Sequence, residues 1–189
     1  MDSTQLGTRL RALRQERGKT LDEVAATTGV SRSFLSLVEN GRSDITTGRL
    51  IELVRYYGVS ITDLVPEEGF SDLSPTDDVL VARAVERQHI ESRSEGMDVA
   101  LLLPTTGRSL MLAQIDFAPG AHMSEPAHHA GEEIVHVLAG AVAIALDGGE
   151  PIKLNAGDSI SYAAATPHAY ENIAEGPSRA LVIVTPPSY

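Results

Sequence analysis

The stretch that decides the fold of the front of the chain is TLDEVAATTGVSRSFLSLVENGR, residues 20–42. Thr20 followed three residues later by Glu23 is a capping box, which predicts that a helix begins there. Gly29 predicts the end of that helix, and Ser31 predicts the start of a second one, which an Asn-Gly pair then ends. The pattern is typical of two short helices joined by a tight turn.

The second of these helices has an inner and an outer side. Leu35 and Val38 lie three residues apart and are expected to face the core. The side chains that remain outside are mostly small, polar or basic, an arrangement that lets a helix enter a major groove of DNA. The candidate DNA-binding residues are Arg32, Ser33, Ser36, Leu37 and Arg42.

The position of each of these side chains, on the helix or just after it, indicates an expected role. Arg32 lies in the first turn, where it could bond guanine O6 and N7 together, and Ser33 could bond a base or a phosphate. Leu37 lies one turn further on and could contact a thymine methyl group, whereas Ser36 and Arg42 are better placed for phosphates. The alternative is that both arginines are solvated surface charges. The core pattern leaves both outward and favours the DNA-binding interpretation.

Residues 5–65 resemble the helix-turn-helix domain of the Xre/Cro-repressor family. The family's arginine in helix 1 stands here as Arg14, its Thr-x-x-Glu-x-Ala run as residues 20–25, and its Glu-Asn-Gly run as residues 39–41. The resemblance implies an ion pair between Arg14 and Glu39 that ties the first helix to the third, and it implies double-stranded DNA as a partner. The alternative is a module of the same fold that binds proteins instead.

The remaining periodicity predicts an all-α domain of five helices over residues 1–65. Three leucines at spacings of four and three predict a first helix that ends at Gly18. A fourth helix is expected over residues 46–57, and a last capped turn over residues 60–64. Periodicity then disappears in PEEGFSDLSPTDD, residues 66–78, which predicts a linker.

The net charge of -11 is unevenly divided along the chain. Residues 1–65 hold nine Lys/Arg and eight Asp/Glu, whereas residues 66–189 hold six and eighteen. An acidic second half is screened from DNA phosphates over about 10 Å at ordinary salt. We therefore expect modest DNA affinity that falls steeply with salt, and a homodimer that supplies useful specificity.

Composition excludes several other classes of protein. The sequence contains no cysteine, so disulfides and thiolate metal sites are excluded. The N-terminal stretch is charged and amphipathic, unlike a signal peptide, and no apolar run approaches the roughly 18 residues of a membrane span. We expect a cytoplasmic protein that does not associate with membranes.

After the linker, the hydrophobic pattern changes from period 3.6 to period 2. Eight or so strands in residues 79–189, with no helical stretch, predict an all-β sandwich or small barrel. The expected strands cover residues 79–85, 97–103, 110–117, 134–138, 141–146, 159–162, 168–172 and 180–184.

Two blocks of this half are similar to the paired motifs of the cupin superfamily, a jelly-roll barrel that commonly holds a divalent metal. The first block contains Pro-Gly at residues 119–120, HHAGEE at residues 128–133 and VLAG at residues 137–140. The second runs from Gly149 and contains TPH at residues 166–168. The resemblance implies two histidines and a glutamate in the first block and one more histidine in the second.

The spacing between Glu133 and Gly140 places the second of the family's histidines at His129 and the first at Ala127, so one of the four ligands is missing. The implied metal ligands are then His129, Glu133 and His168. Two imidazoles and one carboxylate suit non-haem Fe(II) and can also hold Zn, Mn or Ni. The alternative is a hydrogen-bonded polar pocket without metal. The histidines expected not to be ligands are His122, His128 and His136.

Two functions remain open at this point. In the first, a transcriptional regulator, the helical domain binds an operator as a dimer and the barrel binds a small-molecule effector, in a pocket expected to include Tyr162, Tyr170 and Met111. In the second, the chain resembles the iron-dependent epoxidase of phosphonate antibiotic biosynthesis, whose helical domain serves the active site. The outward reading side, and a barrel with only six Lys/Arg to hold a phosphonate, favour the regulator.

Overall fold

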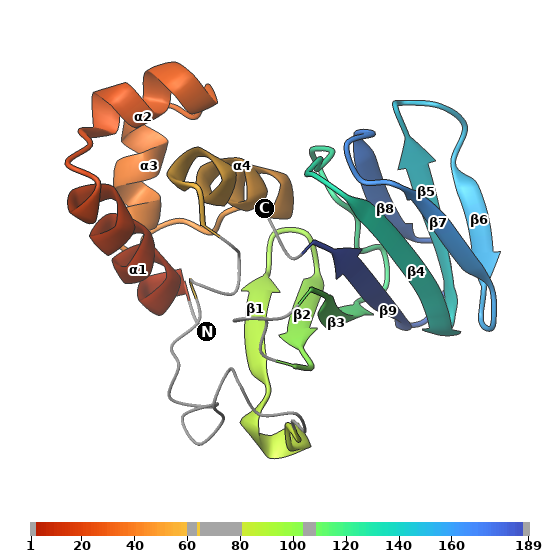
Figure 1. Cartoon of the computed structure of the whole chain (residues 1–189). Helices are drawn as coiled ribbons and strands as arrows, with labels where there is room; N and C mark the ends of the chain where they lie inside the picture. Colours follow the sequence, from red (N-terminus) through yellow and green to blue (C-terminus); the bar gives the residue numbers. More distant parts are fainter. Residues whose placement is uncertain (1–2, 60–63, 65–80, 104–108, 187–189) are drawn as a thin grey trace.

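The computed structural model describes residues 3–59, 64, 81–103 and 109–186. These residues form a helical domain followed by a β-sheet domain (Figure 1). The predicted linker, residues 66–78, lies outside the described residues. So does most of the turn expected over residues 60–64, and the described residues contain four α-helices instead of the five expected.

The helices begin and end where local capping signals place them. The capping box is formed in full, because the Thr20 hydroxyl accepts from the backbone N–H of Glu23 and the Glu23 carboxylate accepts from that of Thr20. Gly29 ends its helix with φ 71°, and the Ser31 hydroxyl accepts from the N–H of Phe34. The helices are α1 (Ser3–Glu16), α2 (Leu21–Thr28), α3 (Arg32–Glu39) and α4 (Thr47–Tyr57).

Helices α1 and α3 cross in close contact. A Cβ atom at Gly7 of α1 would lie 2.1 Å from the backbone oxygen of Val38, so this crossing requires glycine. Further along α1, Arg14 bonds both carboxylate oxygens of Glu39 at 2.6 and 2.9 Å. The ion pair implied by the family resemblance is therefore confirmed, and it fixes α3 to its neighbour.

The second domain consists of nine strands among the described residues, in two antiparallel sheets. The larger sheet has the order β1-β2-β3-β9-β4-β7 and the smaller one β6-β5-β8. The strands are β1 (Gln88–Ser92), β2 (Met97–Leu101), β3 (Met111–Phe117), β4 (Glu132–Ala139), β5 (Ala141–Leu146), β6 (Ile152–Asn155), β7 (Ser159–Ala163), β8 (His168–Asn172) and β9 (Ser178–Thr185).

The predicted strands differ from the structure at three places. The strand expected over residues 79–85 is wrong within the described part, where Ala84–Glu86 is a 3-10 turn. Val85 is 94% exposed, so its apolar side chain has no sheet face to pack against. Strands β1 and β6 were not predicted, because each is short and polar at the sheet edge, and β6 buries only Leu154.

Helix α4 lies between the rest of the helical domain and the barrel (Figure 1). A Cβ atom at Gly48 of α4 would lie 2.9 Å from the backbone oxygen of Glu125, which shows how closely the helix approaches the barrel. No helix in the described ranges has both the length and the apolar character needed to traverse a bilayer.

Candidate metal centre and DNA-reading face

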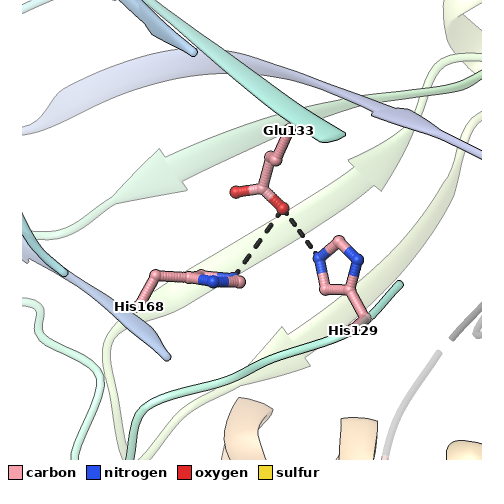
Figure 2. A group of neighbouring side chains, drawn as sticks. All are labelled: His129, Glu133 and His168. Carbon is pink, nitrogen blue, oxygen red and sulfur yellow. Dashed lines mark hydrogen bonds and ion pairs between the residues drawn. The ribbon is translucent and has the colours of Figure 1, made fainter. Parts of the chain in front are cut away.

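Three segments of the barrel bring His129, Glu133 and His168 together (Figure 2). Glu133 lies on β4, where Val135 and Val137 also face inward, as the alternation of a strand requires. His168 begins β8, and its backbone pairs with that of Ala127, which brings the segment before His129 alongside. The three residues are 2–3% exposed and form a buried polar cluster.

The cluster is arranged around one carboxylate oxygen. Glu133 Oε2 lies 2.9 Å from His129 Nε2 and 3.8 Å from His168 Nε2 (Figure 2). The two Nδ1 atoms lie 3.1 Å from the carbonyl oxygen of Ala130 and 2.9 Å from that of Thr166, so each ring is placed to donate an Nδ1–H to the backbone. In that tautomer both Nε2 lone pairs face the carboxylate.

Two tyrosines bind the other oxygen of the same carboxylate. The hydroxyl groups of Tyr162 and Tyr170 both donate to Glu133 Oε1, and they lie 2.8 Å from each other. Tyr162 is the cross-strand partner of Glu133 in the β4–β7 pairing. This leaves Oε2 as the carboxylate oxygen directed at the imidazoles.

The donor set fits a divalent transition metal. Metal bonds of about 2.0–2.2 Å place neighbouring donor atoms roughly 3.0–3.5 Å apart, between the two distances from Glu133 Oε2. Imidazoles whose second nitrogen is fixed by a backbone carbonyl are typical of metal ligands. Burial lowers the pKa of His168, against the opposing effect of the Glu133 carboxylate, so this imidazole is neutral at pH 7 and can offer a lone pair.

The three histidines expected not to be ligands have other partners. The His128 ring accepts a hydrogen bond from the Arg55 guanidinium of α4 and so is turned to the helical domain. His122 contacts the carbonyl of its neighbour Gly120, and His136 bonds the Ser159 hydroxyl on the outer side of β4. Position 127 presents only a buried methyl group to the cavity beside the cluster.

That cavity has a volume of about 60 Å³, and its lining includes two of the three residues predicted for the effector pocket, Met111 and Tyr170. Tyr162 reaches the cluster through its hydroxyl without being part of the lining. The lining also contains Thr47 and Ile51 of α4, which no sequence motif indicated. Their place depends on how the two domains pack, and no local pattern encodes it.

The structure places the candidate DNA-binding residues on one side of α3 and the turn after it. The Arg32 side chain is 64% exposed and forms an ion pair with Asp22 of α2 at 3.1 Å. Ser33 and Arg42 are exposed, Ser36 is half-buried, and Leu37 is 43% exposed. The opposite side of α3 buries Leu35 and Val38, as predicted.

The helical domain exposes the second helix of a helix-turn-helix, and the barrel buries a His-Glu-His cluster. These two features together define the class of protein. Residues 5–67 match the helix-turn-helix domain family and residues 113–184 match the cupin domain family. The chain belongs to the HTH-type transcriptional regulators of the Xre type that carry a cupin domain.

Two curated relatives illustrate this membership. The chain is 27% identical over 184 residues to the HTH-type transcriptional regulator PuuR of Escherichia coli K12, covering 97% of this chain and 96% of the relative. It is 39% identical over 79 residues to an uncharacterized HTH-type transcriptional regulator, y4dJ, of Sinorhizobium fredii, covering 41% of this chain and 92% of the relative. The first similarity extends through both domains.

Solved structures share the two-domain architecture. An HTH_3 family transcriptional regulator from Vibrio cholerae is 26% identical, with a TM-score of 0.73 and coverage of 97% of this chain and 96% of that chain. The apo structure of HppE is 20% identical, with a TM-score of 0.50 and coverage of 97% and 100%. The second likeness concerns the fold alone.

Proposed function

We propose that this chain is a DNA-binding transcriptional regulator that reads an operator with α3 and binds a small-molecule effector in its barrel. The observation that carries the proposal is the exposed outer side of α3. Among the described residues, the contacts between the domains are made by α4 and the residues before it, so no described residue of the barrel covers the side of α3 that presents Arg32, Ser33 and Leu37. The relatives named above support the same function.

Within this proposal, the residues of α3 and of the turn after it have separate tasks. Arg32 exchanges its exposed ion pair with Asp22 for a guanine edge, a small loss because exposed pairs contribute about 0–1 kcal/mol. Leu37 contacts a thymine methyl group, and Arg42 contacts a phosphate. A homodimer places two such heads on half-sites about one helical turn apart.

Binding of the full-length protein to operator DNA tests the reading face. We expect Arg32→Ala to weaken sequence-specific binding by roughly 5- to 150-fold, the equivalent of about 1–3 kcal/mol for one bidentate base contact. The matched control is Arg179→Ala, which removes another exposed arginine with one carboxylate partner, on the barrel. Equal affinities of Arg32→Ala and Arg179→Ala for the operator would remove α3 as the reading helix.

We further propose that His129, Glu133 and His168 hold a divalent metal such as Fe, Zn, Mn or Ni. When bound, the metal would act as a Lewis acid that fixes a polar head group of the effector. The chain itself supplies the two lone pairs of the imidazoles and the Oε2 atom of Glu133, while the tyrosine hydroxyls hold Oε1. The buried position excludes bulk water from these groups.

Calorimetric titration of the metal-stripped protein with Zn²⁺ and Mn²⁺ tests the centre. We expect His168→Ala and Glu133→Gln to reduce metal affinity by at least 10- to 100-fold, because each removes one of only three donors. His136→Ala is the control, since that imidazole bonds Ser159 on the outer side of the barrel. Unchanged affinity in both cluster variants would show that the cluster is a polar pocket without metal.

An enzyme remains the second candidate, because three protein ligands would leave coordination positions for a substrate. The cavity beside the cluster argues against a phosphonate substrate, since its lining contains no Lys or Arg among the described residues. Operator binding that depends on Arg32 but survives His129→Ala would favour the regulator. Operator binding that does not depend on Arg32 would favour the enzyme.

A further inference from the structure

The cavity beside the His-Glu-His cluster is built by both domains. Thr47 and Ile51 of α4 form part of its lining, and Ile51 is 7% exposed. The other lining residues belong to the barrel, from β2, β3, β4, β8, β9 and the segment before β4. Helix α4 of the helical domain therefore forms one wall of the barrel's pocket.

The lining restricts what the cavity can accept. Its polar groups lie at the cluster, at Tyr170 and at Thr47, whose hydroxyl donates to Glu95, while Met97, Met111 and Met123 contribute to an apolar remainder. Such a lining suits a molecule with an apolar body and one polar head group. The volume of about 60 Å³ is far below the roughly 300 Å³ at which ordinary ligand pockets begin, so a molecule of effector size requires a wall to move.

The wall formed by α4 is held in place by one buried carboxylate. Glu95, in the turn between β1 and β2, is 3% exposed and accepts the Thr47 N–H and hydroxyl at 2.8 and 2.7 Å. The Ser92 and Ser124 hydroxyls and the Ser124 N–H also donate to Glu95, at 2.9, 3.1 and 3.0 Å. The carboxylate thus binds the positive end of the α4 dipole and ties it to two barrel segments.

Residues 124–129 contact both the cavity and the helical domain. Ala127 and His129 line the cavity. In the same segment, Glu125 pairs with Arg49 at 2.6 Å and His128 accepts from Arg55, both on α4. A displacement of this segment at the cavity therefore changes its contacts with α4 directly.

The same contacts continue to the reading helix. The Arg49 guanidinium that pairs with Glu125 also lies 5.0 Å from the ring centroid of Phe34, on α3. One guanidinium group thus contacts both the barrel segment and α3. Movement of α4 changes the position of α3 relative to the barrel through packed groups.

We propose that Ile51 sets the size of molecule that the barrel accepts, and that a molecule larger than the present cavity displaces α4 from Glu95 and so moves the reading head. The proposal deepens the proposed function and rests on it only for the consequence on DNA. Since coupling is reciprocal, whatever fixes α4 against the barrel also weakens binding of the larger molecule.

Covalent filling of the cavity tests the proposal without knowledge of the effector. The chain has no cysteine, so Met111→Cys creates a single thiol in the cavity wall. We expect benzyl methanethiosulfonate to label this thiol at least tenfold faster when Gly48→Ala is added, because the new methyl group would lie 2.9 Å from the Glu125 carbonyl and loosen α4. Gly176→Ala, whose methyl group meets no atom within 4 Å, is the matched control and should not alter the rate.

The labelled protein supplies the second readout. The benzyl adduct should reduce hydrogen-exchange protection of the Thr47 amide at least tenfold, while a methyl disulfide adduct, close in shape to methionine, should not. Ile51→Ala should restore protection in the benzyl adduct by making room for the ring. Unchanged protection of β5 amides in each sample shows that the barrel remains folded, and Val99→Cys, also in the lining, replaces Met111→Cys if that variant does not fold.

Equal labelling rates in the Gly48→Ala and Gly176→Ala backgrounds would overturn the proposal, and so would a benzyl adduct that leaves Thr47 protected. Failure of Ile51→Ala to restore protection would remove Ile51 as the size-limiting residue. None of these measurements uses DNA. Their failure is therefore distinct from a failure of operator binding, which Arg32→Ala tests separately.

Discussion

At the scale of single residues, the ion pair between Arg14 and Glu39 joins two segments that are 25 residues apart. Arg14 donates to both carboxylate oxygens and also to the carbonyl oxygen of Lys19 at 2.8 Å. Glu39 is only 7% exposed, and its hydrogen bonds raise the pKa of Arg14 above its ordinary value. The attraction between the two charges therefore offsets the cost of removing each of them from water.

Removing one partner of this pair should cost more than removing both. We expect Arg14→Ala to lower the free energy of unfolding by about 3–5 kcal/mol, because it leaves a buried carboxylate unpaired. Arg14→Met combined with Glu39→Leu should lose much less, since neither charge remains. Urea denaturation of Arg14→Met, Glu39→Leu and the variant with both substitutions gives the double-mutant cycle, and additive losses would show that the two side chains do not interact.

At the scale of elements, the crossing of α1 and α3 depends on the absence of a side chain. Gly7 is buried where α1 meets the backbone of Val38. In an isolated helix alanine is favoured over glycine by about 1 kcal/mol, so local propensity alone would favour replacing this glycine. In the folded protein, the close contact with the Val38 backbone favours glycine at this position instead.

We expect Gly7→Ala to destabilise the protein by about 1–3 kcal/mol, because the new methyl group overlaps a backbone carbonyl that cannot rotate away. Thermal denaturation followed by circular dichroism measures the effect. Gly176→Ala, with open space around it, is again the control. A Gly7→Ala protein as stable as the control would mean that α1 and α3 separate at little cost.

At the scale of the whole molecule, charge is segregated between the parts that the sequence distinguished. The helical part is nearly neutral, and the excess of acidic over basic residues lies in the second half. The ion pairs of Lys19 with Glu23 and of Arg32 with Asp22 are both exposed. For the proposed regulator we therefore expect a DNA affinity that depends on a small number of cationic side chains and on the salt concentration.

Salt dependence identifies which cations contact phosphates. We expect Arg42→Ala to weaken operator and non-operator binding alike, and to reduce the slope of log K against log salt by about 0.9 for each phosphate that the arginine neutralises in the native complex. Fluorescence anisotropy between low and moderate salt measures the slope, with Arg179→Ala as the barrel control. A slope that Arg42→Ala leaves unchanged would place this side chain away from the backbone of DNA.

Much of this protein could be predicted from local sequence. Capping at Thr20 and Ser31 and the period-3.6 and period-2 patterns are short-range signals, and the family motifs added Arg14–Glu39 and the cluster of His129, Glu133 and His168. The structure brings each of these sets together. The role of the cluster as a metal site stays a prediction.

Other features were decided only by the tertiary structure. The hydroxyls that fix Glu133 come from strands whose register depends on the packed sheet, and Glu95 has no motif around it. Thr47 and Ile51 look in the sequence like ordinary positions of an amphipathic helix. They become the wall of a cavity because the two domains dock against each other. Docking depends on the shapes and charges of both surfaces, which neither the helical pattern nor the strand pattern describes.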